Sequence, residues 1–200
     1  MLAVAIFAQG VMPHRHLGLI AADLLGEDRA IVSDVHGTTR DTIEETLNID
    51  GILFRFIDTA GLRETSEVVE KIGIERTFKK ISEASIVLGM VDLTRDLDTT
   101  LETVSDILDK VDFNCQKLVI LLNKTDIFDI NKNVSTINTI VSLIENKGFK
   151  AQLTNEGEIH GTESHFEENH SKDVVNILPI SAKTGSGIRV LRNLLASTQR

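Results

Sequence analysis

Short apolar runs alternate along this chain with segments in which apolar residues recur every three or four positions. Residues 2–8 (LAVAIFA), 84–92 (ASIVLGMVD), 117–123 (KLVILLN) and 174–181 (VVNILPIS) are the apolar runs. Continuous runs of this length, bounded by polar residues, are typical of strands buried on both faces of a parallel sheet. We therefore predict four buried strands.

Residues 46–58 have the pattern of a hairpin. The segments TLNID and ILFRFID meet at Asp50-Gly51. Asp-Gly between two strand-like segments favours a two-residue turn, because both residues tolerate a positive φ. The hairpin adds one antiparallel strand to the predicted sheet.

Helical periodicity predicts the remaining elements. Residues 68–82 place Ile74, Phe78 and Ile81 on one face, and a helix is expected to end at Gly26. Further helices are predicted over residues 98–110, over 134–147 before Gly148, and around Ile188, Leu191 and Leu195.

This alternation predicts one α/β domain over residues 1–200, with a mostly parallel sheet, one antiparallel hairpin strand and helices on both faces. Residues 150–173 are polar and irregular, and are predicted to be a surface insertion. That segment contains His160, His165 and His170, whose spacing of five fits neither a helix face nor a strand face. We interpret it as solvated rather than metal-binding.

Composition narrows the functional classes. The net charge of −9 argues against a domain that grips a nucleic-acid backbone by itself. The longest apolar runs are far shorter than the roughly 20 residues of a membrane helix. Cys115 is the single cysteine, which fits a reducing cytoplasm, and we expect it to be a small buried residue.

Two loops after predicted strands carry groups suited to reading guanine. Asn123 to Asp126 (NKTD) follow the strand over 117–123. The Asp126 carboxylate can accept from guanine N1–H and from its 2-amino group, whereas adenine has neither donor and would leave the carboxylate unpaired. The Asn123 amide can bond the base edge and tie neighbouring loops, and the Lys124 stem can lie along the base plane. Alone, the tetrapeptide equally fits a turn.

The second loop is SAK, Ser181 to Lys183, after the last strand. The Ala182 N–H is a candidate donor to guanine O6. Taken alone, Ser181 is better explained as a serine that starts a helix. The pairing of the two loops at consecutive strand ends makes the nucleotide interpretation more specific, because ligands bind beyond the carboxyl ends of parallel strands.

Two further segments suit phosphate and magnesium chemistry. DTAG, Asp58 to Gly61, ends the strand ILFRFID, where an aspartate can hold a water of Mg²⁺ and a glycine lets a backbone N–H approach a phosphate. GTTRD, Gly37 to Asp41, supplies a threonine hydroxyl that can ligate Mg²⁺ while a γ-phosphate is present. Each is also compatible with a plain turn.

In this order the loops resemble the guanine-nucleotide-binding domain of translation-factor-class GTPases. A narrower resemblance lies in LLGEDRAIVSDVHGTTRDTIEE, DTAGLRETSEVVEKIGIER and ILPISAKTGSGI. These segments are similar to the G domain of the bacterial tRNA uridine-modification GTPases, the MnmE/TrmE family. The resemblance covers about residues 20–92, 117–126 and 174–195, and it implies a Ras-like P-loop GTPase fold.

That resemblance implies GTP or GDP, Mg²⁺ and K⁺ as cofactors and GTP hydrolysis as the activity. It also implies pairing of G domains in the GTP state, a flavoprotein partner in the modification of the tRNA wobble uridine, indirect action on tRNA, and a cytoplasmic protein without a membrane segment. Glu70 matches the glutamate that orients the attacking water, although a solvated helix charge is the simpler interpretation of that residue alone.

The resemblance also assigns site residues. Thr39 matches the Mg²⁺ threonine, with Asp58 acting through water, and the backbone carbonyls of Ser33, Val35 and Thr38 match K⁺ ligands. The implied GTP-binding residues are Ser33, Asp34, Val35, His36, Gly37, Thr38, Thr39, Asp58, Thr59, Ala60, Gly61, Asn123, Lys124, Thr125, Asp126, Ser181, Ala182 and Lys183.

The expected phosphate loop departs from the family pattern G-x-P-N-x-G-K-S. Residues 10–19 read GVMPHRHLGL, and Pro13 falls on the family proline. Val11 and His16 stand at the two glycine positions and His14 at the asparagine position. Leu17 stands at the lysine position and Gly18 at the serine position. The site therefore lacks its lysine charge and the glycines that let backbone N–H groups face the phosphates. Near neutral pH, histidines supply little charge in their place.

Three explanations of residues 1–19 stay open. The favoured one is that this stretch does not represent the natural protein, through a frameshift, a misassembly or an altered start, because the other functional loops match the family. The others are a degenerate G domain kept as a partner-binding or dimerisation module, and an unusual loop that still binds GTP. Because the family's other domains have no counterpart here, we expect a fragment or an excised domain.

Overall fold

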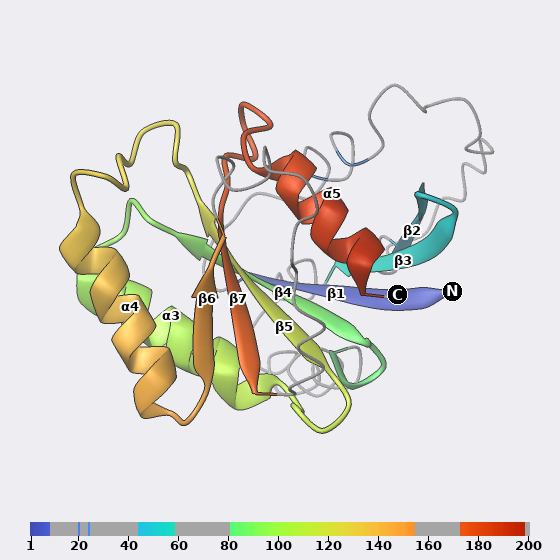
Figure 1. Cartoon of the computed structure of the whole chain (residues 1–200), viewed down its shortest axis with the longest axis horizontal. Coiled ribbons are helices and arrows are strands. Elements are labelled where there is room, and N and C mark those ends of the chain that lie inside the picture. Colours follow the sequence, from blue (N-terminus) through green and yellow to red (C-terminus); the bar gives the residue numbers. More distant parts are fainter. Residues whose placement is uncertain (9–19, 21–23, 25–43, 59–80, 155–172, 199–200) are drawn as a thin grey trace, which may run out of the picture.

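A computed structural model describes residues 1–8, 20, 24, 44–58, 81–154 and 173–198 (Figure 1). Within these residues the strands are β1 (Leu2–Ala8), β2 (Glu44–Ile49), β3 (Ile52–Asp58), β4 (Ile86–Asp92), β5 (Lys117–Asn123), β6 (Lys150–Leu153) and β7 (Val174–Pro179). The helices are α3 (Leu97–Lys110), α4 (Val134–Asn146) and α5 (Ile188–Ser197).

The described strands form one sheet in the order β2-β3-β1-β4-β5-β7-β6. β2 pairs with β3 antiparallel, and every other neighbouring pair is parallel. The β2–β3 turn is made by Asp50 and Gly51 at φ 52° and 86°, as the Asp-Gly signal predicts. The predicted mostly parallel sheet with one antiparallel strand is confirmed.

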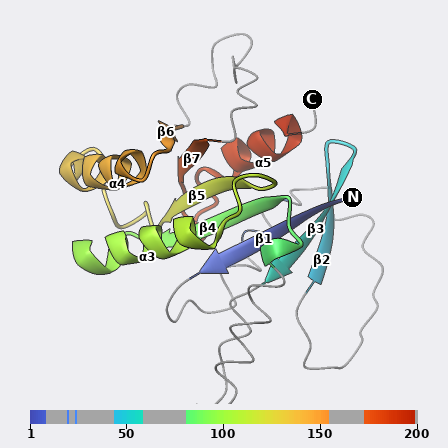
Figure 2. The ribbon, with the colours of Figure 1, turned by 90° about the horizontal axis from the view of Figure 1, so that it is seen from below.

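Helices cover both faces of the sheet (Figure 2). On one face, α5 packs its Leu191 and Leu195 against inward residues of β1, β3 and β4. On the other face, α3 and α4 pack Ile107 and Ile140 against β4 and β5. Alternate residues of β4 and β5 belong to opposite cores, which explains why their sequences are apolar throughout.

The strand at the start of the chain fits the centre of the sheet. β1 lies between β3 and β4, and Val4, Ala5 and Ile6 are at most 2% exposed. Farther along, Ile20 and Leu24 are helical, one turn apart and buried in the α5-side core. β1 matches the predicted strand over 2–8, and Ile20 and Leu24 agree with the predicted helix before Gly26. The departure from the family pattern therefore lies between β1 and Ile20.

Two predictions need correction. Residues 150–173 do not form an irregular segment throughout, because Lys150–Leu153 are strand β6, which pairs with β7 at the sheet edge. The alternation of Ala151 and Leu153 was too short to signal a strand. Cys115 is exposed rather than buried, since it lies in the turn between α3 and β5. Residues 155–172, with the three histidines, lie outside the described residues.

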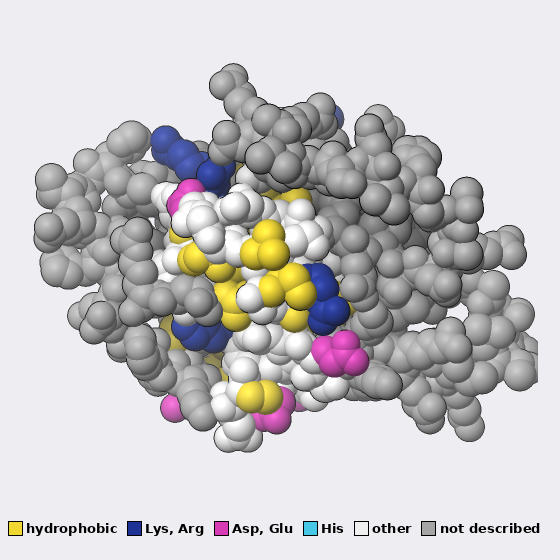
Figure 3. Space-filling view, turned by 90° about the vertical axis from the view of Figure 1, so that its right-hand side faces the viewer, with side chains coloured by type: hydrophobic (Ala, Val, Ile, Leu, Met, Phe, Trp, Pro, Cys, Tyr) yellow, Lys and Arg dark blue, Asp and Glu magenta, His cyan; other side chains and the backbone are white. Residues whose placement is uncertain are grey.

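The surface at the amino ends of the parallel strands is partly apolar. Met1 is 77% exposed, and Leu53, beside the β2–β3 turn, is 44% exposed. Seen from this side of the molecule, apolar side chains gather between basic ones (Figure 3). This surface lies at the opposite end of the strands from the polar loops described below.

No described helix is both long and apolar enough to cross a lipid bilayer.

Candidate nucleotide site

The carboxyl ends of the parallel strands bring the predicted loops to one edge of the sheet. Asp58 is the last residue of β3, and Asn123 is the last residue of β5. Ser181 follows β7, whose Pro179 lies opposite Leu122 of β5. The backbone thus confirms that Asp58, Asn123 and Ser181 lie at the same sheet edge. The side chain of Asp58 is outside the description.

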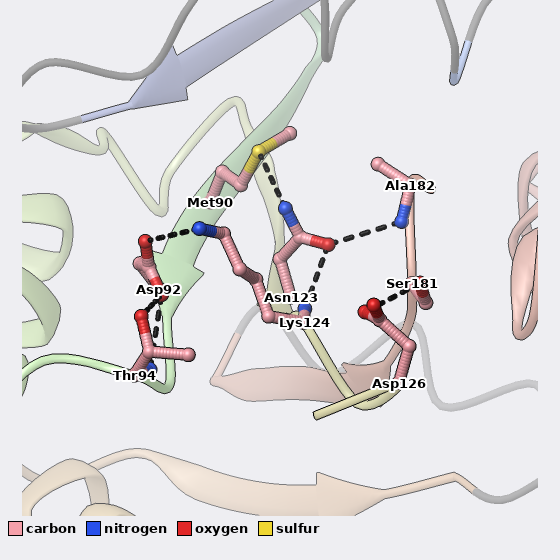
Figure 4. Close-up of polar contacts among 8 residues, drawn as sticks. All are labelled: Met90, Asp92, Thr94, Asn123, Lys124, Asp126, Ser181 and Ala182. Atoms are coloured by element: carbon pink, nitrogen blue, oxygen red, sulfur yellow. Dashed lines mark hydrogen bonds and ion pairs between the residues drawn. The ribbon is translucent and has the colours of Figure 1, made fainter. Parts of the chain in front are cut away.

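Asn123 joins the two base-reading loops (Figure 4). Its side chain is buried, and its Oδ1 accepts from the Lys124 N–H at 2.8 Å and from the Ala182 N–H at 3.0 Å. Its Nδ2 donates weakly to Met90 Sδ, 3.7 Å away. Two N–H donors on one oxygen fix the orientation of the amide. Asn123 therefore ties the loops together as the sequence predicts.

Asp126 is linked to the other loop through its carboxylate. The Ser181 hydroxyl donates to Asp126 Oδ1 at 2.8 Å, and Lys183 Nζ lies 3.7 Å from Oδ2. The hydrogen bond from Ser181 lowers the pKa of Asp126, so this carboxylate is ionised near neutral pH. An ionised carboxylate is acceptor-only, with about four lone-pair sites, and keeps capacity for further N–H donors.

Ser181 also builds the turn that leads into α5. Its hydroxyl accepts from the Thr184 N–H at 3.2 Å, and its carbonyl accepts from the Gly185 N–H at 2.9 Å. Gly187 follows with φ 78°, and a methyl group there would collide with the carbonyl oxygen of Pro179. Ser181 therefore does not start the helix, since the N-cap of α5 is Gly187; its hydroxyl builds the preceding turn and also holds Asp126.

The Ala182 N–H, a candidate donor to guanine O6, is directed to Asn123 in this structure. A base carbonyl would have to share that donor with the Asn123 oxygen.

Lys124 reaches across the strand ends, with its Nζ 3.3 Å from Asp92 Oδ2. Thr125 donates its N–H to the Ile180 carbonyl at 3.2 Å, which adds a backbone link between the same two loops.

Several of these contacts involve residues that sequence reasoning did not select. Asp92 is the last residue of β4, Thr94 follows the strand, and Met90 lies within it. The available sequence signal was the place of Asp92 at the end of a predicted strand; its register with Asn123 comes from the structure. A cavity of about 820 Å³ also opens beside Asp126, between the loop over residues 125–131, the start of α4, Leu153 and Ser186.

The remaining predicted site residues lie outside the described residues. They are Ser33, Asp34, Val35, His36, Gly37, Thr38, Thr39, Thr59, Ala60, Gly61 and Glu70, and the expected phosphate loop over 10–19 lies there too. Among described residues, no group of three or more His, Cys, Asp or Glu side chains is placed to hold a metal.

An open α/β sheet with Asn123, Asp126 and Ser181 at its carboxyl edge is the arrangement of a G domain. The sequence pattern of the 50S ribosome-binding GTPase family matches residues 19–124. This chain belongs to that GTPase family, and the match begins just after the atypical stretch.

Relatives specify the resemblance further. The tRNA modification GTPase MnmE of Bacteroides thetaiotaomicron is 52% identical over 108 residues, which are 53% of this chain and 22% of that protein. MnmE of Acetivibrio thermocellus is 46% identical over 125 residues, 62% of this chain and 25% of that protein. The chain is thus a homologue of the MnmE G domain, and the matched part spans about a quarter or less of those relatives.

Solved structures show the same fold at low sequence identity. A crystal structure of Era with MgGDPNP and a 16S ribosomal RNA segment matches with TM-score 0.58 and 23% identity, over 98% of this chain and 56% of that one. The G domain of the Thermotoga maritima FeoB iron transporter matches with TM-score 0.53 and 16% identity, over 100% and 99%. The predicted G-domain fold is confirmed.

Proposed function

We propose that this chain is the G domain of an MnmE-type tRNA modification GTPase and that its described edge reads guanine. The observation that supports this proposal is the link between NKTD and SAK: Asn123 holds Ala182, and Ser181 holds Asp126. These contacts preorganise the base-reading groups before a ligand arrives, which reduces the ordering cost of binding.

Asp126 is the group that selects the base. Its carboxylate accepts the Ser181 hydroxyl and retains acceptor capacity for the N1–H and 2-amino groups of guanine. Adenine would leave that capacity unused next to a ligand that excludes water, and the unpaired acceptor would cost binding energy. Discrimination therefore rests on hydrogen-bond pairing rather than on shape.

The catalytic half of the proposal rests on the resemblance. Glu70 would orient the attacking water, Thr39 and Asp58 would hold Mg²⁺, and the carbonyls of Ser33, Val35 and Thr38 would hold K⁺. Hydroxyl, carboxylate and carbonyl oxygens suit both cations. Gly18, at the position of the family serine, offers no side-chain ligand, so the magnesium donor set is incomplete. Bound Mg²⁺ would neutralise charge on the phosphates.

The wider role is proposed from the same relatives. It comprises dimerisation of G domains in the GTP state, a flavoprotein partner, indirect action on tRNA and a cytoplasmic location without membrane contact. A second candidate is a G domain impaired in nucleotide binding that acts as a partner-binding or dimerisation module. The sequence of residues 11–18 favours it, because the loop has no lysine.

The test of guanine recognition is a calorimetric or NMR titration at high protein concentration. We expect GDP to bind more tightly than ADP. Asp126→Asn should lose GDP affinity by about tenfold or more, because one acceptor becomes a donor. The same variant should gain affinity for xanthosine diphosphate, whose 2-carbonyl accepts from that new donor.

The matched control is Asp129→Asn in the same loop. Asp129 pairs with Lys132 at 3.2 Å and not with the SAK loop, so this variant should bind nucleotides like the unmodified chain. Equal affinities of the unmodified chain for GDP and ADP would refute the guanine assignment.

A further inference from the structure

One ion pair joins the NKTD loop to a residue outside the family motifs, at the same sheet edge. Lys124 Nζ is 3.3 Å from Asp92 Oδ2, and the two side chains are 31% and 17% exposed. Asp92 ends β4, and its register partner Asn123 ends the neighbouring strand β5. The lysine side chain therefore spans from one strand end to the next, beside the base-reading loops (Figure 4).

Asp92 is itself held in place by Thr94. The Thr94 N–H and hydroxyl both donate to Asp92 Oδ1, at 2.9 and 2.6 Å, which leaves Oδ2 for the lysine. Burial alone would raise the pKa of Asp92, but the hydrogen bonds from Thr94 and the ammonium of Lys124 outweigh it and lower the pKa. The carboxylate is therefore charged and oriented without any ligand.

The backbone of Lys124 is fixed as well. Its φ is 76°, an unusual value for a residue with a side chain. The residue is held there because its N–H donates to Asn123 Oδ1, while its carbonyl accepts from the N–H groups of Ile127 and Phe128. A strained backbone persists only where its surroundings determine it, and such positions cluster at functional sites. Both ends of Lys124 are thus restrained.

We propose that Asp92, oriented by Thr94, is a positioning residue that holds the Lys124 stem extended across the strand ends before nucleotide binds. A lysine that is free loses rotamer freedom when a ligand orders it, whereas a lysine already held has little left to lose. The ordered aliphatic stem offers an apolar surface for a purine ring. This proposal rests on the proposed nucleotide binding and adds a residue to it.

The proposal separates affinity from selectivity. An aliphatic stem does not distinguish one purine from another, whereas Asp126 distinguishes them by pairing. Loss of Asp92 should therefore weaken all purine nucleotides by one factor. Loss of Asp126 should change their ranking.

Asp92→Asn is a near-isosteric test. The amide oxygen can still accept from Thr94, while an NH₂ donor replaces the oxygen that faces the Lys124 ammonium. We expect GDP and inosine diphosphate, which lacks the 2-amino group, each to bind about tenfold more weakly, with their affinity ratio unchanged. Asp92→Glu restores the charge and should recover part of the affinity.

Asp109→Asn is the matched control. Asp109 pairs with Lys147 at 2.6 Å between α3 and α4, away from the strand ends, so its loss should leave both affinities unchanged. An unchanged GDP affinity in Asp92→Asn would overturn the proposal. A collapsed GDP to inosine diphosphate ratio would also overturn it, since it would mean that Asp92 maintains the whole loop.

A readout without nucleotide separates this proposal from the proposed function. The ε-methylene of Lys124 should show restricted motion by ¹³C relaxation in the unmodified chain and free motion in Asp92→Asn. Lys117, an exposed lysine at the start of β5, is the reference. If Lys124 is as mobile as Lys117, the proposal fails whatever binds. If Lys124 is ordered but GDP is not preferred to ADP, the proposed function fails instead.

Discussion

The stretches that follow β1 and β5 occupy equivalent places in the fold, because each leaves the carboxyl end of a central parallel strand. The stretch after β5 retains the polar groups of NKTD, and Asn123 and Asp126 contact the loop after β7 in the structure. The stretch after β1, residues 9–19, has no lysine and keeps glycine only at Gly10 and Gly18.

The core elements on either side of the phosphate-loop stretch do not draw on its sequence. β1 before the stretch and the buried Ile20 and Leu24 after it belong to the core on apolar character alone. We therefore expect base recognition and phosphate binding to be separable in this chain, and variants of either part test that separation.

Restoring the family loop should have the largest effect. The repaired chain carries Val11→Gly, His14→Asn, His16→Gly, Leu17→Lys and Gly18→Ser. Each recovered charge-assisted hydrogen bond contributes roughly 1.5–3 kcal/mol, so two or three should tighten GTP binding by several decades. Calorimetry measures the affinity, and phosphate release in K⁺ against Na⁺ measures hydrolysis.

Two results would count against this view of the loop. If the original chain already hydrolyses GTP at the repaired rate, the departures from the pattern are harmless. If repair restores neither binding nor hydrolysis, the partner-binding module becomes the better account of the domain.

Glu70→Ala in the repaired chain should separate hydrolysis from binding. Loss of a group that orients the attacking water should slow single-turnover hydrolysis by about a hundredfold. GDP affinity should not change, since the role proposed for Glu70 concerns only the attacking water. A parallel loss of GDP affinity would show that Glu70 supports the structure rather than the reaction.

Gly187→Ala should destabilise the turn between the SAK loop and α5. A Cβ there meets the Pro179 carbonyl at a residue whose φ is 78°, and we expect the free energy of unfolding to fall by about 2 kcal/mol. Gly51→Ala is the control, because Gly51 also has a positive φ but open space around it, so only the backbone strain of about 1 kcal/mol should apply. Urea unfolding compares the two, and equal losses would contradict the collision.

Ser181→Ala should weaken GDP by about fivefold, because a hydrogen bond of about 1 kcal/mol no longer orients Asp126. Ser197→Ala removes a hydroxyl that donates to the Leu194 carbonyl at the end of α5 and serves as the control. The same titration measures both variants. An unaltered GDP affinity in Ser181→Ala would show that the Ser181 hydroxyl does not contribute to nucleotide binding.

Acid should weaken the Asp92 contacts by a small amount. The folded pKa of Asp92 lies below its ordinary value of 3.8, so its contribution to stability is present above that pH and is lost as pH falls through the folded pKa. For a partly exposed pair this contribution is below about 1 kcal/mol. The stability difference between the unmodified chain and Asp92→Asn should therefore shrink from pH 7 to pH 3 in urea unfolding.

Sequence patterns predicted the elements better than their contacts. Asp50-Gly51, the apolar runs of β4 and β5 and the spacing of Ile188, Leu191 and Leu195 are local signals, and each produced the predicted element. Strand β6 was not predicted because one exposed residue, Lys150, and three half-buried residues carry no clear period. The prediction that Cys115 is buried was wrong, because the burial of a small residue depends on where it lies in the fold and not on its residue type.

The α/β class, the hairpin and the family follow from the amino-acid sequence, because periodicity, turn residues and loop motifs are local in the chain. The same local patterns place Asn123, Asp126 and Ser181 at or just after strand ends. The contacts of Asn123 with the Ala182 N–H, of Ser181 with Asp126 and of Asp92 with Lys124 follow only from how the chain packs. Those pairings join residues up to 59 positions apart, and strand order and register alone bring them within hydrogen-bond reach.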